Sequence, residues 1–352
     1  MTRMVEALGL LAVLFLAFCA FGTDMSHPSL VDAQGVPREE ILSSARIRFL
    51  ALGDVNLGRE VGKRILQGDT LFPFARVQDV FSAHDIVFAN LECTLSEQEG
   101  ETQHPRNNLI FTGPPAGART LHLAGVTVVS TANNHALDYG LKAHAETMEY
   151  LKSAGVLFAG TAPDSTLLYD PVILTCKGVK LALFACTDVM NVEDTKWRRY
   201  VSGADTSRLL PRVRAFRDSV DFIIVSYHGG GEYGARPTQR TTDFTRHMIE
   251  GGADLVLGHH PHVPYGVAHM DGKYGVHSLG NFVFRQPSRY WTQRSFAFSA
   301  EIMKDKAGTR ISSYECLPVM CGLQPEFITP GPESDIISER IRAFSTTIVA
   351  SK

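Results

Sequence analysis

Short apolar runs recur along the chain, and most of them end in a cluster of polar residues. Each has about the length of a strand and is rich in Val, Ile, Leu or Phe, which favours buried β-strands. The runs cover residues 47–52, 86–89, 126–131, 172–175, 179–185, 222–227, 255–257 and 275–278. Residues 139–154 carry apolar side chains at helical spacing with Gly155 behind them as a stop, and residues 238–250 form a second helix-like stretch entered through Pro237.

Strands that alternate with helices predict an α/β fold built in layers. A turn at Lys177 and Gly178 joins two of the runs as a hairpin, so we expect mixed rather than purely parallel sheets. Residues 94–109 and 189–207 are polar and predict long loops, which are often functional. No shift in composition marks a second domain.

The N-terminus has the pattern of a targeting segment. Arg3 precedes an uncharged apolar run over residues 7–22, which predicts a signal peptide or an uncleaved membrane anchor within residues 1–25. The sequence around Cys19 also resembles a lipoprotein box loosely. Residues 26–45 then read as a polar linker. We therefore expect an extracytoplasmic protein that is secreted, periplasmic or membrane-anchored.

Composition narrows the function classes. The formal net charge is −3 over 352 residues, which argues against a basic nucleic-acid partner. Besides Cys19 there are five cysteines. This number is odd and small for a chain of this length, which argues against a disulfide scaffold. Cys316 and Cys321 could pair in an oxidising compartment. Cys176 and Cys186 are not expected to pair, because the hairpin sets them out of register.

The residues that follow the strands carry the candidate chemistry. Ligands of α/β sheets bind at the carboxyl ends of strands, and here those ends carry Asp54, Asn90, Glu92, Asn133, Asn134, His135, His228, the run 259–262 and Asn281. Each alone is compatible with a turn, a core histidine or a solvated charge, except the three imidazoles of His259-His260-Pro261-His262. Carboxylate, amide and imidazole together favour Mn, Fe, Zn or Mg over a structural zinc site. A carboxylate can bridge two cations about 3.5–4 Å apart, and such a pair can activate water.

Six stretches resemble, in order, the signature blocks of the CapA family, which is associated with poly-γ-glutamate capsule synthesis. They are LALGDVNLGR, FANLECTLS, STANNHALDYG, VSYHGGGEY, GADLVLGHHPHV and HSLGNFVF, within residues 47–284. The family is similar to the calcineurin-like metallophosphoesterases, and this implies a four-layer α-β-β-α sandwich of two mixed sheets. We expect this domain over residues 46–330 and a C-terminal tail over residues 331–352; the last ~65 residues match no block.

The resemblance also implies roles for the strand-end residues. Asp54 would be the first ligand, in chain order, of one metal site, and Glu92 would take the position of the bridging carboxylate. Asn134 and His228 would serve a second metal, with His260 and His262 contributing one to each. His135 would not bind metal but would donate to a substrate oxygen or leaving group, or alternatively only hold its loop. The cofactor would be one or two divalent ions.

Two departures from the phosphoesterase pattern bear on activity. Asn56 stands where a phosphoesterase usually has a histidine, and Glu92 replaces an aspartate. The first metal site is therefore expected to be the weaker one. Substrate contacts are expected from Arg59, Asn133 and Tyr233, with Arg236 a weaker candidate, because a guanidinium suits carboxylate and phosphate; for both arginines a salt bridge is the alternative.

Three functions remain open from the sequence. The first is a metal-dependent hydrolase of a phosphoester or of an amide in a glutamyl polymer. The second is a non-catalytic envelope component that binds or exports an anionic polymer beside capsule-synthesis membrane proteins. The third is a periplasmic phosphoesterase with an unrelated substrate. The capsule role follows from the resemblance alone.

Overall fold

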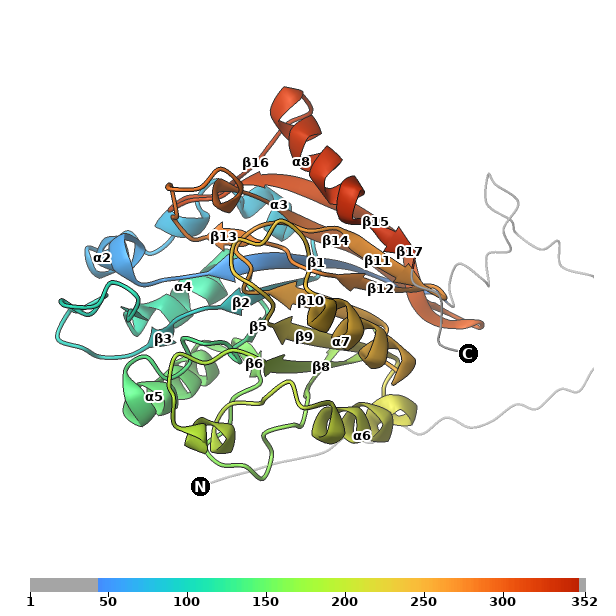
Figure 1. Cartoon of the computed structure of the whole chain (residues 1–352), viewed down its shortest axis with the longest axis horizontal. Helices are drawn as coiled ribbons and strands as arrows, with labels where there is room; N and C mark the ends of the chain where they lie inside the picture. Colours follow the sequence, from blue (N-terminus) through green and yellow to red (C-terminus); the bar gives the residue numbers. More distant parts are fainter. Residues whose placement is uncertain (1–43, 348–352) are drawn as a thin grey trace, which may run out of the picture. The chain divides into compact units, whose positions relative to one another are not determined.

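The computed structural model describes residues 44–347. The predicted signal peptide or anchor, and the linker up to residue 43, lie outside these residues. The described chain contains two large mixed sheets (Figure 1). Among residues 44–347, no helix combines the length and apolarity needed to cross a bilayer.

The first sheet has the strand order β16-β15-β14-β1-β2-β5-β6, and β13 pairs with β1 off this path. Strands β1, β2, β5 and β6 run parallel, whereas β14, β15 and β16 continue the sheet antiparallel to their neighbours. The strands are β1 (Ala45–Val55), β2 (Ile86–Leu91), β5 (Val128–Ser130), β6 (Leu157–Ala159), β13 (Asn281–Val283), β14 (Arg294–Asp305), β15 (Gly308–Met320) and β16 (Glu326–Phe327).

The second sheet has the order β17-β11-β12-β10-β9-β8-β7. Its central strands β8, β9, β10 and β12 are parallel, β11 pairs antiparallel with β12, and the predicted hairpin at Lys177 and Gly178 joins β7 to β8 antiparallel. The strands are β7 (Val172–Cys176), β8 (Val179–Thr187), β9 (Phe222–His228), β10 (Leu255–His259), β11 (Val267–Met270), β12 (Lys273–Val276) and β17 (Thr346–Thr347); a separate small pair is β3 (Thr94–Leu95) with β4 (Thr112–Gly113).

The two sheets pack face to face, because alternate residues of each strand point to opposite sides. In β1, Phe49 and Ala51 face the core between the sheets, together with Phe222 and Leu257 of the second sheet. Leu50 and Leu52 face the other way, into the core beneath the outer helices. This alternation explains why the strands read as continuous apolar runs rather than as one-sided patterns.

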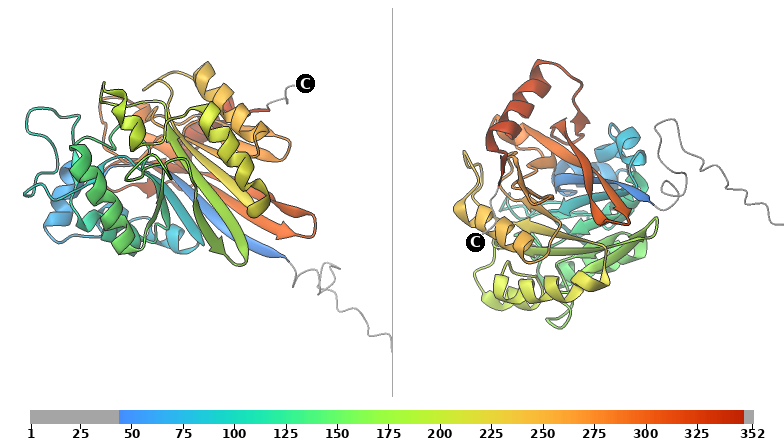
Figure 2. Two further views of the ribbon diagram at one scale, coloured as in Figure 1. Left: turned by 90° about the horizontal axis from the view of Figure 1, so that it is seen from below. Right: turned by 90° about the vertical axis from the view of Figure 1, so that its right-hand side faces the viewer.

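Helices cover both outer faces, so the predicted four-layer α-β-β-α sandwich is confirmed (Figure 2). One helical layer packs on the first sheet: α2 (Arg59–Leu66), α3 (Gln78–Ser82), α4 (Ala116–Ala124) and α5 (Gly140–Ala154). The other packs on the second sheet: α6 (Thr206–Phe216) and α7 (Gln239–Glu250). The short 3-10 helices are η1 (Phe72–Phe74), η2 (Thr195–Arg199), η3 (Arg217–Ser219) and η4 (Trp291–Gln293).

The segment expected as a C-terminal tail contains a helix and a strand within the described residues. Helix α8 (Pro332–Phe344) buries Ile337 and Ile341 against the core between the sheets, and β17 pairs with β11 of the second sheet. Figure 1 shows α8 lying beside β15 and β11. Residues 331–347 therefore close one end of the sandwich instead of trailing from it.

The cysteines do not form disulfides in the described residues, where all five are free. The possible Cys316–Cys321 pair is not formed, because residues 316–320 are extended in β15. Five extended residues span roughly 16 Å, far beyond the Cα separation of a disulfide. Cys176 and Cys186 are also apart, as expected: Cys176 lies opposite Val179, and Cys186 lies opposite Tyr227.

Candidate metal centre

The parallel strands of both sheets end at one shared site. The first sheet delivers Asp54 at the end of β1, Glu92 just after β2 and Asn134 after β5. The second sheet delivers His228 at the end of β9, and His260 and His262 just after β10. All six predicted ligands are at most 4% exposed. The structure therefore brings together every residue that the sequence assigned to metal binding.

Glycines let the backbones approach closely enough for this convergence. A side chain at Gly53 would place its Cβ 2.0 Å from the carbonyl oxygen of Gly280, and one at Gly258 would place it 2.2 Å from that of His277. Each glycine sits directly before a site residue, Asp54 or His259. Without these glycines the strand ends could not pack at this distance.

Two ligand groups overlap at one carboxylate. Asp54, Glu92 and His262 offer atoms that lie within 4.8 Å of one another, and so do Glu92, His228 and His260. In the first group His262 Nδ1 lies 3.2 Å from Asp54 Oδ2, and His262 Nε2 lies 3.6 Å from Glu92 Oε1. Glu92 belongs to both groups, which is the arrangement that a bridging carboxylate requires. A third group, Glu232 with His260 and His262, lies at the rim.

Several of these atoms are buried without a hydrogen-bond partner. They are Asp54 Oδ2, Glu92 Oε1, His260 Nδ1 and both ring nitrogens of His259. Burying polar atoms unpaired is costly, and native proteins do so rarely. Since three separate segments bring such atoms to one place, the residues fit one or two divalent cations with oxygen and nitrogen ligands.

The pKa values of the site residues shift in different directions. Burial by itself would raise the pKa of Asp54, but its contacts with His259 and His262 hold that pKa well below the usual value. Burial, together with the charge of Asp54, raises the pKa of Glu92 well above its usual value. Burial lowers the pKa of His228, and it lowers that of His260 to about 4. Neutral imidazoles are the form that binds metal.

Asn134 and His135 lie on the loop after β5. Asn134 Oδ1 is 2.8 Å from His228 Nε2, so both can face one cation. His135 Nδ1 lies 2.7 Å from Asp138 Oδ2, and its Nε2 lies 3.9 Å from Glu92 Oε1. The ring of Phe111 stacks on His135 with centroids 4.3 Å apart. Asp138 thus orients His135 with Nε2 toward the ligand cluster, a role that the sequence analysis missed although Asp138 stands in the same block.

Asn133 differs from its predicted role as a substrate contact. Its Nδ2 donates to the Leu91 carbonyl at 2.8 Å and to Asn90 Oδ1 at 3.3 Å, and its Oδ1 accepts from the His135 backbone. The side chain is fully buried. Because all its polar atoms bond to the protein, Asn133 ties the loop after β5 to β2 and does not face a substrate.

The other predicted substrate residues lie at the rim. The Arg59 guanidinium packs 4.5 Å from the centroid of Phe111, and its Nε is buried without a partner. The ring of Tyr233 stacks on His262 with centroids 5.9 Å apart, and the Arg289 guanidinium lies 4.4 Å from the centroid of the Tyr233 ring. Arg236 is exposed. Arg59 and Tyr233 are therefore placed to contact a ligand that approaches the cluster.

Backbone strain gathers around the site. Arg59, Tyr233, His260 and His262 all have positive φ angles, between 51° and 92°. Non-glycine residues seldom adopt this conformation, and it is held only where surrounding structure enforces it. Four such residues at one site mark it as functionally constrained.

Other residues of the site went unassigned in the sequence analysis. Asn90, His259 and Asn281 stand among the strand-end residues but received no role. In the structure Asn281 Oδ1 lies 2.9 Å from His262 Nδ1, and His259 Nδ1 lies 3.4 Å from Asp54 Oδ1. Asn56, in place of the phosphoesterase histidine, accepts from the Gly58 amide and is in neither ligand group.

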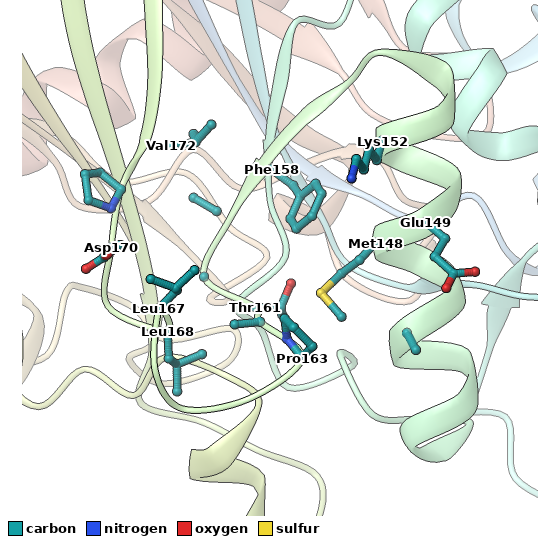
Figure 3. A pocket seen from close by; sticks show the side chains of 15 residues that line it. Met148, Glu149, Lys152, Phe158, Thr161, Pro163, Leu167, Leu168, Asp170 and Val172 are labelled. Carbon is teal, nitrogen blue, oxygen red and sulfur yellow. The ribbon is translucent and has the colours of Figure 1, made fainter.

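A separate cavity of about 650 Å³ lies between α5 and the connection from β6 to β7 (Figure 3). Its walls are largely apolar, with Met148, Phe158, Leu167 and Val172 among them. Glu149, Lys152 and Asp170 also line it. This cavity brings together no set of metal ligands, so the strand-end cluster remains the candidate site.

Comparisons with known proteins give the following matches. Residues 48–286 match the family model described as bacterial capsule synthesis protein PGA_cap. The chain is 28% identical to the capsule biosynthesis protein CapA of Bacillus anthracis over 277 residues, covering 75% of this chain and 67% of the relative. It is 29% identical to the PGA biosynthesis protein CapA of Bacillus subtilis over 292 residues, covering 80% and 74%.

Two solved structures are similar at lower identity. A calcineurin-like phosphoesterase from Bacillus subtilis has a TM-score of 0.47 and 14% identity, covering 86% of this chain and 97% of that one. A phosphatase from Mycoplasma pneumoniae has a TM-score of 0.49 and 14% identity, covering 78% and 94%.

Proposed function

We propose, for a chain that belongs to the bacterial capsule synthesis protein family, the function of a metal-dependent hydrolase in the biosynthesis of an anionic capsule or cell-envelope polymer. The observation that carries the proposal is the pair of ligand groups that share Glu92, with Asp54 and His262 on one side and His228 and His260 on the other. The relatives named for capsule and PGA biosynthesis support poly-γ-glutamate as the polymer.

Two sets of residues that share Glu92 would hold the cations needed for hydrolysis. Asp54, Glu92 and His262 would hold one cation, and Glu92, His228, His260 and Asn134 a second. The bound cations would supply Lewis acidity toward a phosphoryl or carbonyl oxygen and lower the pKa of water. Every ligand side chain is buried, which limits the access of bulk water to the site.

His135 would act on the leaving group. Asp138 Oδ2 accepts the Nδ1 proton of the ring, which presents Nε2 toward the cluster. A protonated Nε2 can donate to the departing oxygen or nitrogen. The stacked ring of Phe111 fixes the plane of the imidazole.

Arg59 and Tyr233 would bind the anionic substrate. The guanidinium of Arg59 is partly desolvated, which lowers its pKa, while the charge of Glu92 opposes that shift. It retains an unpaired Nε, and a guanidinium binds carboxylate or phosphate through its planar fork. We place the protein outside the cytoplasm, beside capsule-synthesis membrane proteins, because its substrate would be an envelope polymer.

The experiment is an assay of the purified chain, stripped with chelator and reloaded with Mn²⁺ or Zn²⁺. Substrates are p-nitrophenyl phosphate esters and γ-glutamyl peptides. We expect metal-dependent turnover that falls at least about 100-fold in His135→Ala and His260→Ala. His269→Ala, at an exposed position of β11, is the matched control. A rate that survives both site substitutions does not come from this site.

A non-catalytic polymer-binding role is the second candidate. The observation that favours it is Asn56, which leaves the first ligand group with a single imidazole, His262. In that case a reloaded protein would bind poly-γ-glutamate saturably and hydrolyse none of the substrates above. Rapid metal-dependent turnover would exclude this candidate.

A further inference from the structure

Asn90 lies within the candidate metal centre, and the proposed function assigns it no role. It stands near the end of β2, directly beside Asp54 in the parallel pairing of β1 and β2, and is fully buried. Its Nδ2 lies 2.9 Å from Asp54 Oδ1, 3.3 Å from Glu92 Oε2 and 3.2 Å from His228 Nδ1. One atom of Asn90 therefore touches a ligand residue of each group.

The amide orientation is suited to a site without cations. The two hydrogens of Asn90 Nδ2 are shared among three acceptors, namely the carboxylates of Asp54 and Glu92 and the unprotonated Nδ1 of His228. In this arrangement His228 Nδ1 accepts from the amide, and His228 Nε2 carries the proton and donates to Asn134 Oδ1 at 2.8 Å. Both nitrogens of His228 are then occupied by hydrogen bonds, and neither is free to bind a metal.

Metal binding through His228 Nε2 reverses these requirements. A neutral imidazole carries one proton, so a metal-binding Nε2 leaves the proton on Nδ1. That N–H would then face the Nδ2 donor of Asn90. Turning the Asn90 amide by 180° replaces this donor with Oδ1, which can accept from His228 Nδ1. The same turn points Oδ1 at the carboxylates of Asp54 and Glu92, where oxygens repel one another unless a cation lies among them.

The turn breaks one other hydrogen bond of Asn90. Asn90 Oδ1 accepts one long hydrogen bond, 3.3 Å from Asn133 Nδ2. Asn133 Nδ2 keeps its shorter bond of 2.8 Å to the Leu91 carbonyl. After the turn Asn90 Nδ2 would face the Nδ2 donor of Asn133, a contact that cation binding must offset, while Asn133 stays paired with the Leu91 carbonyl.

We propose that Asn90 is a metal-linked amide, whose oxygen turns toward the two ligand groups when divalent cations bind and whose nitrogen occupies that place when they do not. The inference rests on the metal centre of the proposed function but not on hydrolysis. Amide and carboxylate oxygens favour hard cations such as Mg²⁺ and Mn²⁺. An amide also carries one negative charge fewer than an aspartate, so the cations would bind exchangeably.

Metal affinity and stoichiometry test the proposal directly. Calorimetric titration with Mn²⁺, and elemental analysis after desalting, would be done on the full chain. Asn90→Asp should bind at least about 10-fold more tightly because it adds a charge among the ligands. Asn90→Leu, similar in size but without polar atoms, should bind about 10–100-fold more weakly. Asn107→Asp adds the same charge on an exposed loop and should leave affinity unchanged.

A spectroscopic measurement reports the turn itself. In ¹⁵N-labelled protein, the Asn90 side-chain amide signal, identified by its loss in Asn90→Asp, should shift on titration with diamagnetic Mg²⁺. The signals of Asn107 serve as an internal reference. Thermal melting of each metal-free variant, followed by circular dichroism, verifies that the compared proteins are folded.

The outcomes separate this proposal from the proposed function. Wild-type affinity in Asn90→Leu, together with equal affinities of Asn90→Asp and Asn107→Asp, overturns the role of Asn90 even if turnover is observed. Tight binding that responds to both Asn90 substitutions, without turnover of any substrate, supports Asn90 and removes the hydrolase. A wild-type protein that binds no divalent cation overturns both.

Discussion

The two sheets make unlike contributions to one site. The first sheet supplies Asp54, Glu92 and Asn134, which offer oxygen atoms, whereas the second supplies mainly imidazoles, from His228, His260 and His262. Burial acts on the two sides in opposite ways. It favours protonated Glu92 on the first side and deprotonated, neutral His228 and His260 on the second.

The difference between the two sheets explains why the site needs both. The two sheets supply complementary parts of the site, because the carboxylates of one repel each other until a cation neutralises them, whereas the imidazoles of the other bring nitrogen ligands without negative charge. Because the two sheets lie face to face, a cation can neutralise the carboxylates of the first sheet. The neutral imidazoles of the second sheet can bind the same cation without losing a proton. The following predictions test how far the two sides differ.

The largest effect is expected at the carboxylate shared by both groups. Glu92→Gln keeps the shape of the side chain but removes its charge, so the affinity for both cations should fall by on the order of 1,000-fold. This loss exceeds the roughly 10–100-fold expected from substituting a residue that only hydrogen-bonds to a ligand. His262→Asn, on the imidazole side, should cost mainly one cation. Calorimetry with Mn²⁺ and elemental analysis give affinity and number. Glu97→Gln, at an exposed position, is the control. Two tightly bound cations in Glu92→Gln would contradict a bridging role.

A buried histidine of the second sheet should make stability depend on pH. Burial lowers the pKa of His277 to about 4, so between pH 6.5 and 4 the unfolded chain binds a proton that the folded one does not. Stability must therefore fall as pH falls through this window, by about 3 kcal/mol for this residue.

Urea unfolding of metal-free protein at pH 7 and pH 4 measures this effect. The loss of stability should be about 3 kcal/mol smaller in His277→Gln than in the wild type. His269→Gln, an exposed histidine of the same sheet, should retain the full loss. Equal pH dependence in all three proteins would mean that His277 titrates normally when folded.

On the carboxylate side, Asp138 should affect rate and not metal. Asp138→Asn removes the carboxylate that accepts from His135 Nδ1, so the ring loses its orientation and preferred tautomer. We expect turnover to fall about 100-fold with metal content unchanged. Asp79→Asn, at an exposed position of α3, is the control. A variant that loses metal instead would identify Asp138 as a support of the ligands.

The smallest effect is expected at the rim. Arg59→Lys keeps the charge but removes the planar fork and its contact with Phe111. KM should rise about 10-fold, with kcat nearly unchanged, because only substrate binding is weakened. Initial rates over a range of substrate concentrations separate the two constants. A fall in kcat at constant KM would place Arg59 in the reaction itself.

Much of the fold could be predicted from local patterns. The apolar runs gave the positions of β1, β2, β5 and the parallel strands of the second sheet, since burial on both faces leaves a continuous apolar signal. The hairpin at Lys177 and Gly178 was predictable because Gly178 tolerates positive φ, and it adopts 77°. The long strands β14 and β15, and the packing of α8, were not predicted. In β15 many side chains are exposed or half-buried, which weakens the apolar signal.

The candidate site was predicted in its members but not in its internal contacts. The residue types at the strand ends identified Asp54, Glu92 and the histidines, because donor chemistry is a property of each residue. Asn133 was assigned to a substrate that it does not face, and Asn90 and Asp138 received no role. A side chain's partners depend on which segments meet, and sequence spacing does not contain that information.

The sequence by itself determined the layered α/β fold, the family and the set of donor residues, because these depend on local periodicity and on the chemistry of single side chains. Only the tertiary structure decided that Asp138 orients His135 and that Asn90 touches both sides, whereas the position of Glu92 in both ligand groups agrees with what the family resemblance implied. The reason is physical: most of these contacts join atoms of different strands, and the distance between segments far apart in the chain is set only when the core packs. The contact between Asp138 and His135 depends on the conformation of one loop, which its packing also sets.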